Sequence, residues 1–191
     1  MKLDGILPFC RKLLSLAVSE GDIAVDATAG KGNDTLFLAK LIGDNGHVYS
    51  FDIQKEAIDA TREKLVLNKL DHKVTLIQTG HENAAEVIQK AHAGRVAAAV
   101  FNLGYLPGSD KSVVTKPNTT IQAIRELFRL MKPAGMIVLV VYHGHTEGQA
   151  EKEELLSYVQ ELDQTKAHVM QYGFINQKNN PPFIIAIEKR G

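Results

Sequence analysis

The sequence contains one cysteine, Cys10, so a single chain cannot form an internal disulfide. No run of 18 or more apolar residues occurs, which argues against a membrane-spanning helix. The cysteine and the histidines lack the spacing of a zinc site, and we expect no metal centre. Acidic, basic and proline residues interrupt residues 1–22, which therefore do not resemble a signal peptide. These absences predict a cytoplasmic protein in which Cys10 is a packed thiol.

The sequence also lacks a net charge, since it has 22 basic and 22 acidic residues. A neutral chain is not a strong, purely electrostatic binder of nucleic acid. The charge is nevertheless uneven, because residues 146–164 carry six acidic residues and one basic residue. The rest of the chain has 21 basic and 16 acidic residues, which is compatible with a local basic surface.

Short β-rich segments alternate with helical periods, and the 191 residues suffice for one domain, 1–191, that begins with a helical segment at 1–20. We expect strands at 23–27, 47–52, 74–78, 96–102, 136–142, 167–174 and 183–188, and helices at 33–41, 55–68, 83–90, 119–131 and 147–163. This order predicts an α/β fold with a seven-stranded, mostly parallel sheet and a C-terminal antiparallel hairpin. A dinucleotide-binding domain would have six parallel strands and a separate substrate domain, so the pattern favours a Rossmann-like class I methyltransferase sandwich.

The segment VDATAGKGNDT, residues 25–35, has the glycine spacing of a nucleotide-binding turn but departs from two common patterns. Thr35 occupies the third glycine position of the dinucleotide fingerprint G-x-G-x-x-G, and Thr28 occupies the first glycine position of a typical methyltransferase loop. Gly30 and Gly32 allow the backbone to approach a ligand closely. Because the segment follows the first strand, it lies at the sheet edge where open α/β sheets bind ligands.

Acidic side chains near this turn favour one cofactor over another. Asp52 ends the second strand, 22 residues after the first glycine of the turn, and is suited to bind both ribose hydroxyls of an adenosine cofactor. Asp26 and Asp34 flank the turn at a helix start, where a pyrophosphate requires the absence of negative charge. A cationic sulfonium tolerates both acids, so we predict S-adenosylmethionine rather than NAD. Gly80 and His81 follow the third strand and could flank the adenine.

The fourth strand ends in NLGY, residues 102–105, which has the shape of the N-P-P-Y signature of amine methyltransferases, with Leu and Gly in place of the prolines. The Asn102 side-chain oxygen and the next backbone carbonyl can accept hydrogen bonds from an amine and turn its lone pair toward the sulfonium methyl. Tyr105 can stack on a base. Asp110 can accept from a cationic amine, and Lys111 can contact a phosphate. The pattern therefore predicts methyl transfer to an amine.

The fifth strand ends in YHGHTEG, residues 142–148, which brings two histidines to the same sheet edge. His143 and His145 are candidates to relay a proton or to line the substrate pocket, and equally to hydrogen-bond the loop alone. The histidines at positions 47, 72, 92 and 168 are expected to be surface or structural residues.

Five segments of the chain together resemble one bacterial family over about residues 25–150. They are DATAGKGNDT, FDIQ, GHEN, FNLGYLPGSDK and KPAGMIVLVVYHGHTEG, and they are similar to the small rRNA methylase family of the YtqB or MnmM type. Thr28 is normal within the family pattern DAT-x-G-N-G-x-D-T, whereas Lys31 replaces its usual Asn. The resemblance implies an S-adenosylmethionine-dependent homodimer. It also implies methylation of the primary amine of 5-aminomethyl-2-thiouridine at tRNA wobble position 34, giving 5-methylaminomethyl-2-thiouridine.

The candidate site residues follow from these motifs and from the resemblance. The cofactor is expected to contact Asp26, Thr28, Gly30, Asn33, Asp34, Asp52, Gln54, Gly80, His81 and Asn102. The amine is expected to be placed by Asn102, Tyr105, Asp110, His143 and His145. The anticodon stem-loop is expected to contact Tyr105 and the cations Arg11, Lys12, Lys111 and Lys116. A wobble base is single-stranded, so it can stack on an aromatic ring without the opening of a duplex.

Other classes of function stay open at this level. An enzyme that methylates rRNA or a small-molecule amine would use the same residues, and a shift assay with bulk tRNA would separate the small-amine enzyme from a tRNA enzyme. A non-catalytic nucleotide-binding protein of the same fold has no need to orient an amine, so Asn102 and Tyr105 argue against it. An NAD enzyme is a more distant alternative.

Overall fold

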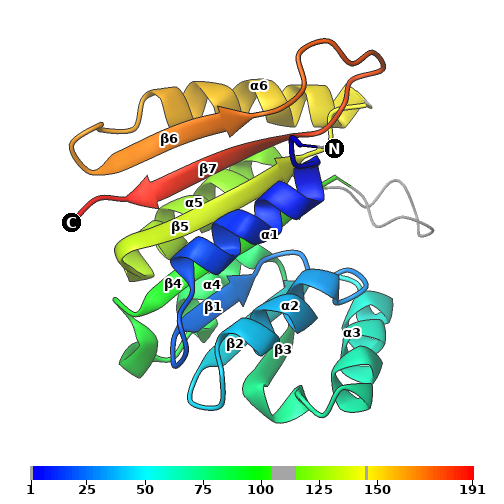
Figure 1. Cartoon of the computed structure of the whole chain (residues 1–191), viewed down its shortest axis with the longest axis vertical. Coiled ribbons are helices and arrows are strands. Elements are labelled where there is room, and N and C mark those ends of the chain that lie inside the picture. The colour runs from blue at the N-terminus through cyan, green and yellow to red at the C-terminus, as the bar shows by residue number, and fades with distance from the viewer. Residues whose placement is uncertain (1, 105–114, 145) are drawn as a thin grey trace.

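The computed structural model describes residues 2–104, 115–144 and 146–191. Its described residues form a seven-stranded sheet with the order β3-β2-β1-β4-β5-β7-β6. The strands are β1 (Ile23–Asp26), β2 (His47–Asp52), β3 (Val74–Gln78), β4 (Val96–Leu103), β5 (Met131–Val141), β6 (Ala167–Tyr172) and β7 (Phe183–Lys189). The first five strands pair in parallel, whereas β7 runs antiparallel to both β5 and β6 (Figure 1). The predicted parallel sheet with a late antiparallel hairpin is confirmed.

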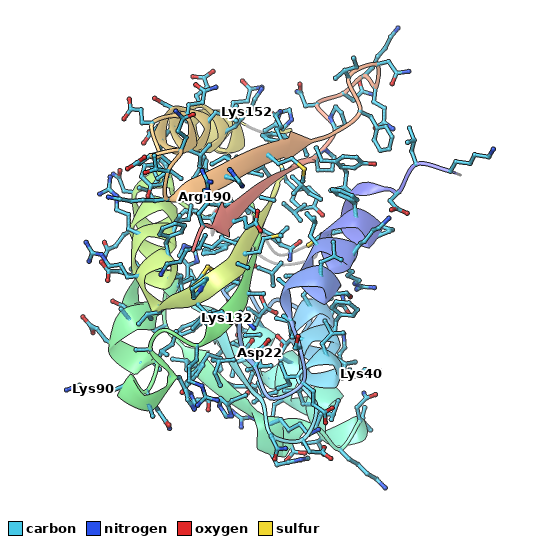
Figure 2. All side chains as sticks on the ribbon, turned by 60° about the vertical axis from the view of Figure 1, so that its left-hand side comes forward. Asp22, Lys40, Lys90, Lys132, Lys152 and Arg190 are labelled. Atoms are coloured by element: carbon cyan, nitrogen blue, oxygen red, sulfur yellow. The ribbon has the colours of Figure 1, made fainter. Side chains whose placement is uncertain are left out.

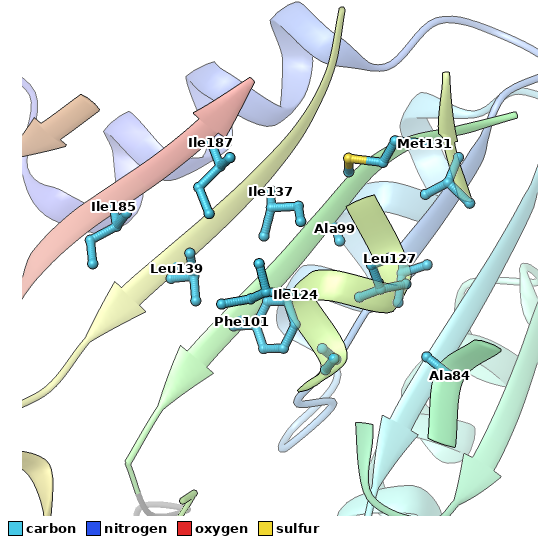
Figure 3. Packing of buried hydrophobic residues seen from close by; sticks show 14 of the residues in the cluster. Ala84, Ala99, Phe101, Ile124, Leu127, Met131, Ile137, Leu139, Ile185 and Ile187 are labelled. Atoms are coloured by element: carbon cyan, nitrogen blue, oxygen red, sulfur yellow. The ribbon is translucent and has the colours of Figure 1, made fainter. Parts of the chain in front are cut away.

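Helices cover both faces of the sheet. They are α1 (Ile6–Ala17), α2 (Asn33–Leu41), α3 (Lys55–Leu67), α4 (Ala84–Val87), α5 (Pro117–Leu130) and α6 (Thr146–Gln160). One hydrophobic cluster joins α1 and α2 to one face, and a second joins α5 and α6 to the other. In the second cluster, Ile124 and Leu127 of α5 pack against Phe101 and Leu139 of the central strands (Figure 3). The predicted α/β sandwich is therefore confirmed, with apolar strands buried on both faces. None of the helices in the described ranges is long and apolar enough to cross a membrane.

Two elements differ from the sequence prediction. The helix expected at 83–90 is a 3₁₀ turn (His81–Asn83), the four-residue α4 and a second 3₁₀ turn (Lys90–His92). Strand β5 begins at Met131, directly after α5, rather than at residue 136. Val96 pairs with Met131 and Ala98 pairs with Met136, so the intervening residues form a bulge. Pro133 lacks a backbone N–H, which suits a position outside the regular ladder.

The bulge is held at the end of the sheet opposite the candidate site. The Lys132 ammonium donates to both carboxylate oxygens of Asp22, at 2.8 and 2.7 Å, and Figure 2 shows the two labelled side chains beside each other. Asp22 directly precedes β1, and its backbone carbonyl accepts from the His47 N–H at the start of β2. The ion pair therefore connects the beginnings of β1 and β2 to β5. This connection fixes the register of these strands, and the register sets where their carboxyl ends lie at the candidate site.

Candidate cofactor and substrate site

A cavity of about 820 Å³ opens at the carboxyl ends of the parallel strands. This position and volume are typical of ligand sites in open α/β sheets. Among the predicted cofactor residues, those that line the cavity are Thr28, Gly30, Asn33, Asp34, Asp52, Gln54, Gly80, His81 and Asn102. The carboxyl ends of the strands thus bring together residues from four separate segments of the chain.

The turn after β1 is built on two glycines in the left-handed region. Gly30 has a φ of 53° and Gly32 has a φ of 70°, and the Gly32 N–H donates to the Ala29 carbonyl at 2.8 Å. A Cβ atom at Gly32 would lie 2.9 Å from the Thr61 side chain of α3, which is too close for a real contact. The sequence places glycine here because the turn needs both the unusual φ and the close approach to α3.

Asp52 at the end of β2 is held by backbone donors on both carboxylate oxygens. Its Oδ2 accepts from the Gly30 N–H at 2.9 Å, and its Oδ1 accepts from the Gln54 N–H at 3.0 Å. These bonds orient the carboxylate and leave each oxygen able to accept one further donor. The arrangement fits a ribose that offers two neighbouring hydroxyls. Ile53 also lines the cavity and is 54% exposed, which provides an apolar surface beside this carboxylate.

Asp26 lies behind the wall of the cavity rather than on it. Its side chain is fully buried, and it accepts from the Thr28 N–H at 3.1 Å and from the Thr35 hydroxyl at 2.6 Å. Burial, followed by the nearby Asp34 carboxylate, raises the pKa of Asp26 to about 7. Asp26 is not among the residues that line the cavity, and both of its oxygens hold the turn and helix α2 together. Its expected contact with the cofactor stays a prediction.

Asp34, in the first turn of α2, orients the side chain of Asn102. The Asn102 side-chain N–H donates to Asp34 Oδ2 at 2.8 Å, while the Asn102 backbone N–H donates to the Thr28 hydroxyl at 2.7 Å. The amide nitrogen is thus committed to a carboxylate, and the described residues offer no donor to the Asn102 side-chain oxygen. Asp34 also pairs with Arg11 of α1, whose Nε lies 3.6 Å from Oδ1. A negatively charged side chain at this helix start disfavours a pyrophosphate.

A second acceptor lies next to Asn102 on the same strand. The backbone carbonyl of Leu103 accepts from the Tyr142 N–H at 3.3 Å, and a carbonyl oxygen has room for one more donor. Tyr142 directly follows β5, lines the cavity and is 38% exposed. Burial raises its pKa, and the Asp34 carboxylate raises it further, so the phenol stays neutral. The sequence analysis missed Tyr142, although its place directly before the strand-end histidine was a signal for it.

The two described strand-end histidines are engaged with backbone carbonyls. His81 Nδ1 lies 3.1 Å from the Ala27 carbonyl, so this nitrogen carries the proton, and burial lowers the pKa of the ring. His143 Nε2 lies 2.9 Å from the Pro181 carbonyl, and the ring packs edge-on against Phe183. Both rings line the cavity. His143 thus lines the cavity and bonds the segment before β7, and its expected part in placing the amine stays a prediction.

Comparison with known proteins assigns the chain to a family. A sequence model described as "Putative rRNA methylase" matches residues 48–188. The chain belongs to this family. A "putative rRNA-methylase" from Clostridium thermocellum is 44% identical, with a TM-score of 0.95 over 99% of this chain and 100% of that chain. A "putative methyltransferase" from Streptococcus mutans, solved in complex with S-adenosylhomocysteine, is 39% identical, with a TM-score of 0.88 over 98% of this chain and 99% of that chain.

A curated relative carries a more specific name. The chloroplastic tRNA (mnm(5)s(2)U34)-methyltransferase of Arabidopsis thaliana is 42% identical over 144 residues, which cover 71% of this chain and 52% of that protein. The chain therefore spans about half the length of this relative. More distant methyltransferase structures share the sheet and its helices, so the fold of this rRNA methylase family member is the class I methyltransferase fold, as predicted.

The predicted RNA-contacting cations of this family member differ in where they lie. Arg11 and Lys116 line the cavity, and Lys116 is exposed at the start of α5. Lys12 lies outside the cavity wall and pairs with Asp4 at 3.4 Å. The predictions for Tyr105, Asp110, Lys111 and His145 fall outside the described residues and stay predictions.

Acidic and histidine side chains are frequent in this site, but they do not converge on one point. Within residues 2–104, 115–144 and 146–191, no group of three or more His, Cys, Asp or Glu side chains could hold a metal ion. Cys10 of α1 is buried, and burial, together with Asp34 and Asp26, raises the pKa of its thiol to about 12. The thiol is thus a packed side chain in the described structure, as its sequence context predicts.

Proposed function

We propose that this protein is an S-adenosylmethionine-dependent N-methyltransferase that converts 5-aminomethyl-2-thiouridine to 5-methylaminomethyl-2-thiouridine at wobble position 34 of tRNA. The observation that carries the proposal is the orientation of Asn102, whose amide nitrogen is committed to Asp34 and whose oxygen is left to accept from an amine. The name of the Arabidopsis relative supports the choice of nucleoside, and the ligand of the Streptococcus mutans relative supports the choice of cofactor.

The residues of the cavity fit this cofactor. Asp52 has two oriented oxygens for the ribose hydroxyls, and Ile53 offers an apolar surface for the adenine. Asp34 at the start of α2 tolerates a cation and disfavours a phosphate, which argues for a sulfonium over a dinucleotide. When bound, S-adenosylmethionine supplies an electrophilic methyl group on a sulfonium.

The chain's own residues are suited to orient an amine. A neutral primary amine has two N–H bonds and one lone pair. If the Asn102 side-chain oxygen and the Leu103 carbonyl each accept one N–H, the lone pair is left pointing in a third, fixed direction. Asp34 makes this possible because its bond to the amide nitrogen prevents the amide from flipping a donor toward the amine. The chain thus supplies position and orientation, and it needs no strong acid for this reaction.

The direct test is nucleoside mass spectrometry on tRNA that carries 5-aminomethyl-2-thiouridine, incubated with the protein and S-adenosylmethionine. We expect a gain of one methyl group at the wobble nucleoside. Asn102→Ala should lower turnover at least 100-fold, while affinity for S-adenosylhomocysteine changes much less. Methylation of rRNA or of a small amine, with none on tRNA, would show that the substrate is not tRNA. Binding without any methyl transfer would favour a non-catalytic nucleotide-binding protein.

The resemblance to the family also supports a homodimer that binds the anticodon stem-loop. Among the described cations that line the cavity, Arg11 and Lys116 are the ones that we expect to hold RNA phosphates. Analytical ultracentrifugation of the protein alone tests the dimer, and a gel-shift titration with an anticodon stem-loop tests RNA binding. A monomer at micromolar concentration would refute the dimer and would leave the proposed reaction unaffected.

A further inference from the structure

Glu151 of α6 is a buried carboxylate that the proposed mechanism does not use. It is 2% exposed, whereas Glu153 and Glu154 on the same helix are exposed. A charged side chain is rarely buried unless it is hydrogen-bonded, because its desolvation is costly. Glu151, on the buried side of α6, therefore needs hydrogen-bond donors for its carboxylate.

Two threonine hydroxyls donate to this carboxylate. Thr115 Oγ1 donates to Glu151 Oε2 at 2.6 Å, and Thr120 Oγ1 donates to Glu151 Oε1 at 2.9 Å. Thr115 lies two residues before α5 and lines the cavity, and Thr120 lies in the first turns of α5 and is fully buried. Glu151 thus fixes the start of α5, including one residue of the cavity wall.

Thr115 in turn fixes the end of β4. The Gly104 N–H donates to Thr115 Oγ1 at 3.0 Å, and the Thr115 N–H donates to the Gly104 carbonyl at 3.1 Å. Gly104 has a φ of 139°, a conformation that L side chains rarely adopt, so the chain direction changes here. Gly104 lies two residues after Asn102 and directly before Tyr105 in the sequence. The backbone between the two residues predicted to place the amine is therefore held by Thr115.

We propose that Glu151 is a positioning residue for the amine site, which acts through Thr115 to hold Gly104 at the end of β4. This inference rests on the proposed methyl transfer to an amine. With its proton committed to Glu151, the Thr115 oxygen presents its lone pairs to the Gly104 N–H. Without the carboxylate, the hydroxyl is free to rotate and can no longer hold that N–H in one orientation. Cofactor contacts at Gly30, Asp52 and Gln54 lie on other loops and should not depend on Glu151.

The test compares Glu151→Gln and Thr115→Val with two controls, Thr115→Ser and Glu154→Gln. We expect Glu151→Gln and Thr115→Val to lower kcat/KM for amine methylation at least 10-fold, mainly through kcat, while affinity for S-adenosylhomocysteine stays within about threefold. Thr115→Ser keeps the hydroxyl and should restore activity, and Glu154→Gln is exposed and should have no effect. If Glu151 and Thr115 act through one chain of contacts, the variant that combines Glu151→Gln and Thr115→Val should lose little more kcat/KM than either single variant.

Amide hydrogen exchange supplies a readout that does not depend on activity. Faster exchange of the Gly104 and Thr115 amides in Glu151→Gln, without a general rise elsewhere, would support the inference. Unchanged exchange at these two amides with unchanged kcat/KM would overturn it, and so would a loss of cofactor affinity equal to the loss of activity. If the wild-type protein methylates no amine while the two amides still respond to Glu151→Gln, the proposed function fails and the structural link stands.

Discussion

Asp52→Ala tests the cofactor site most directly. The substitution removes a carboxylate whose oxygens accept from the Gly30 and Gln54 N–H groups at 2.9 and 3.0 Å. These bonds hold the turn after β1 against the end of β2, and the remaining lone pairs are the proposed acceptors for two ribose hydroxyls. The side chain is only partly buried, so the two backbone donors can be hydrated in the variant and the fold should survive.

The expected loss follows from the two ribose contacts. A hydrogen bond to a charged group contributes about 1.5–3 kcal/mol, so two of them contribute about 3–6 kcal/mol. Since about 1.4 kcal/mol corresponds to a tenfold change in Kd, the affinity for S-adenosylhomocysteine should fall about 10²- to 10⁴-fold. Asp52→Asn keeps one acceptor oxygen, so its affinity for S-adenosylhomocysteine should lie between those of Asp52→Ala and the wild type.

Isothermal titration calorimetry with S-adenosylhomocysteine measures this loss, and thermal unfolding without ligand checks the fold. Asp59→Ala is the matched control, because the Asp59 side chain on the neighbouring helix α3 is 48% exposed and pairs with Lys55. Asp59→Ala should leave the Kd unchanged. A loss of less than about fivefold for Asp52→Ala, with an unchanged melting temperature, would refute the assignment of the ribose subsite.

Further variants test the turn, the buried acid and the core. Gly32→Ala should weaken S-adenosylhomocysteine binding at least tenfold by calorimetry, whereas Gly21→Ala, also at positive φ but with nothing within 4 Å of its Cβ, should not. Asp26 has a pKa of about 7 against its usual 3.8, so folding takes up a proton and stability should fall by up to about 1.4 kcal/mol per pH unit as the pH rises toward 7. Asp26→Asn should remove this contribution in urea denaturation at pH 5 and 7, and an identical pH dependence in both proteins would contradict it. Leu127→Ala in the core should lower the free energy of unfolding by about 2–5 kcal/mol in the same assay. Leu67→Ala, at an 83% exposed position, should leave it nearly unchanged.

The positions of the parallel strands along the chain were predictable because each is a short apolar run bounded by helical periods. The start of β5 was not, because it depends on the pairing of Met131 with Val96, two residues that are distant in sequence. Pro133 and Gly135 disfavour a continued helix, but such a local signal cannot show that a strand begins before them and bulges around them. The segment after β3 was too short for its periodicity to distinguish one helix from a series of 3₁₀ turns.

The residues of the site were predictable because parallel strands deliver their carboxyl ends to one edge. The direction of each side chain was not. Asp26 ends a strand that is covered on both faces, so no alternation of polar and apolar residues shows that it is buried beside the cavity and does not line it. Glu151 lies in a run of acids that indicates a solvated helix face, and only the packing of α6 beside α5 shows that one of them is buried.

Charge separates the two cofactor classes more clearly than the glycines do. The Gly30 and Gly32 turn would serve a dinucleotide or a sulfonium equally well, since both need a close approach to the backbone. Asp34 is decisive, because it lies in the first turn of α2, where a pyrophosphate would be bound, and Arg11 offsets its charge only at 3.6 Å. The same carboxylate holds the Asn102 nitrogen at 2.8 Å. Asp34 thus disfavours phosphate at the cofactor and leaves the Asn102 oxygen for the proposed amine. Asp34→Asn should therefore impair both cofactor affinity and turnover, whereas Asn102→Ala should impair mainly turnover.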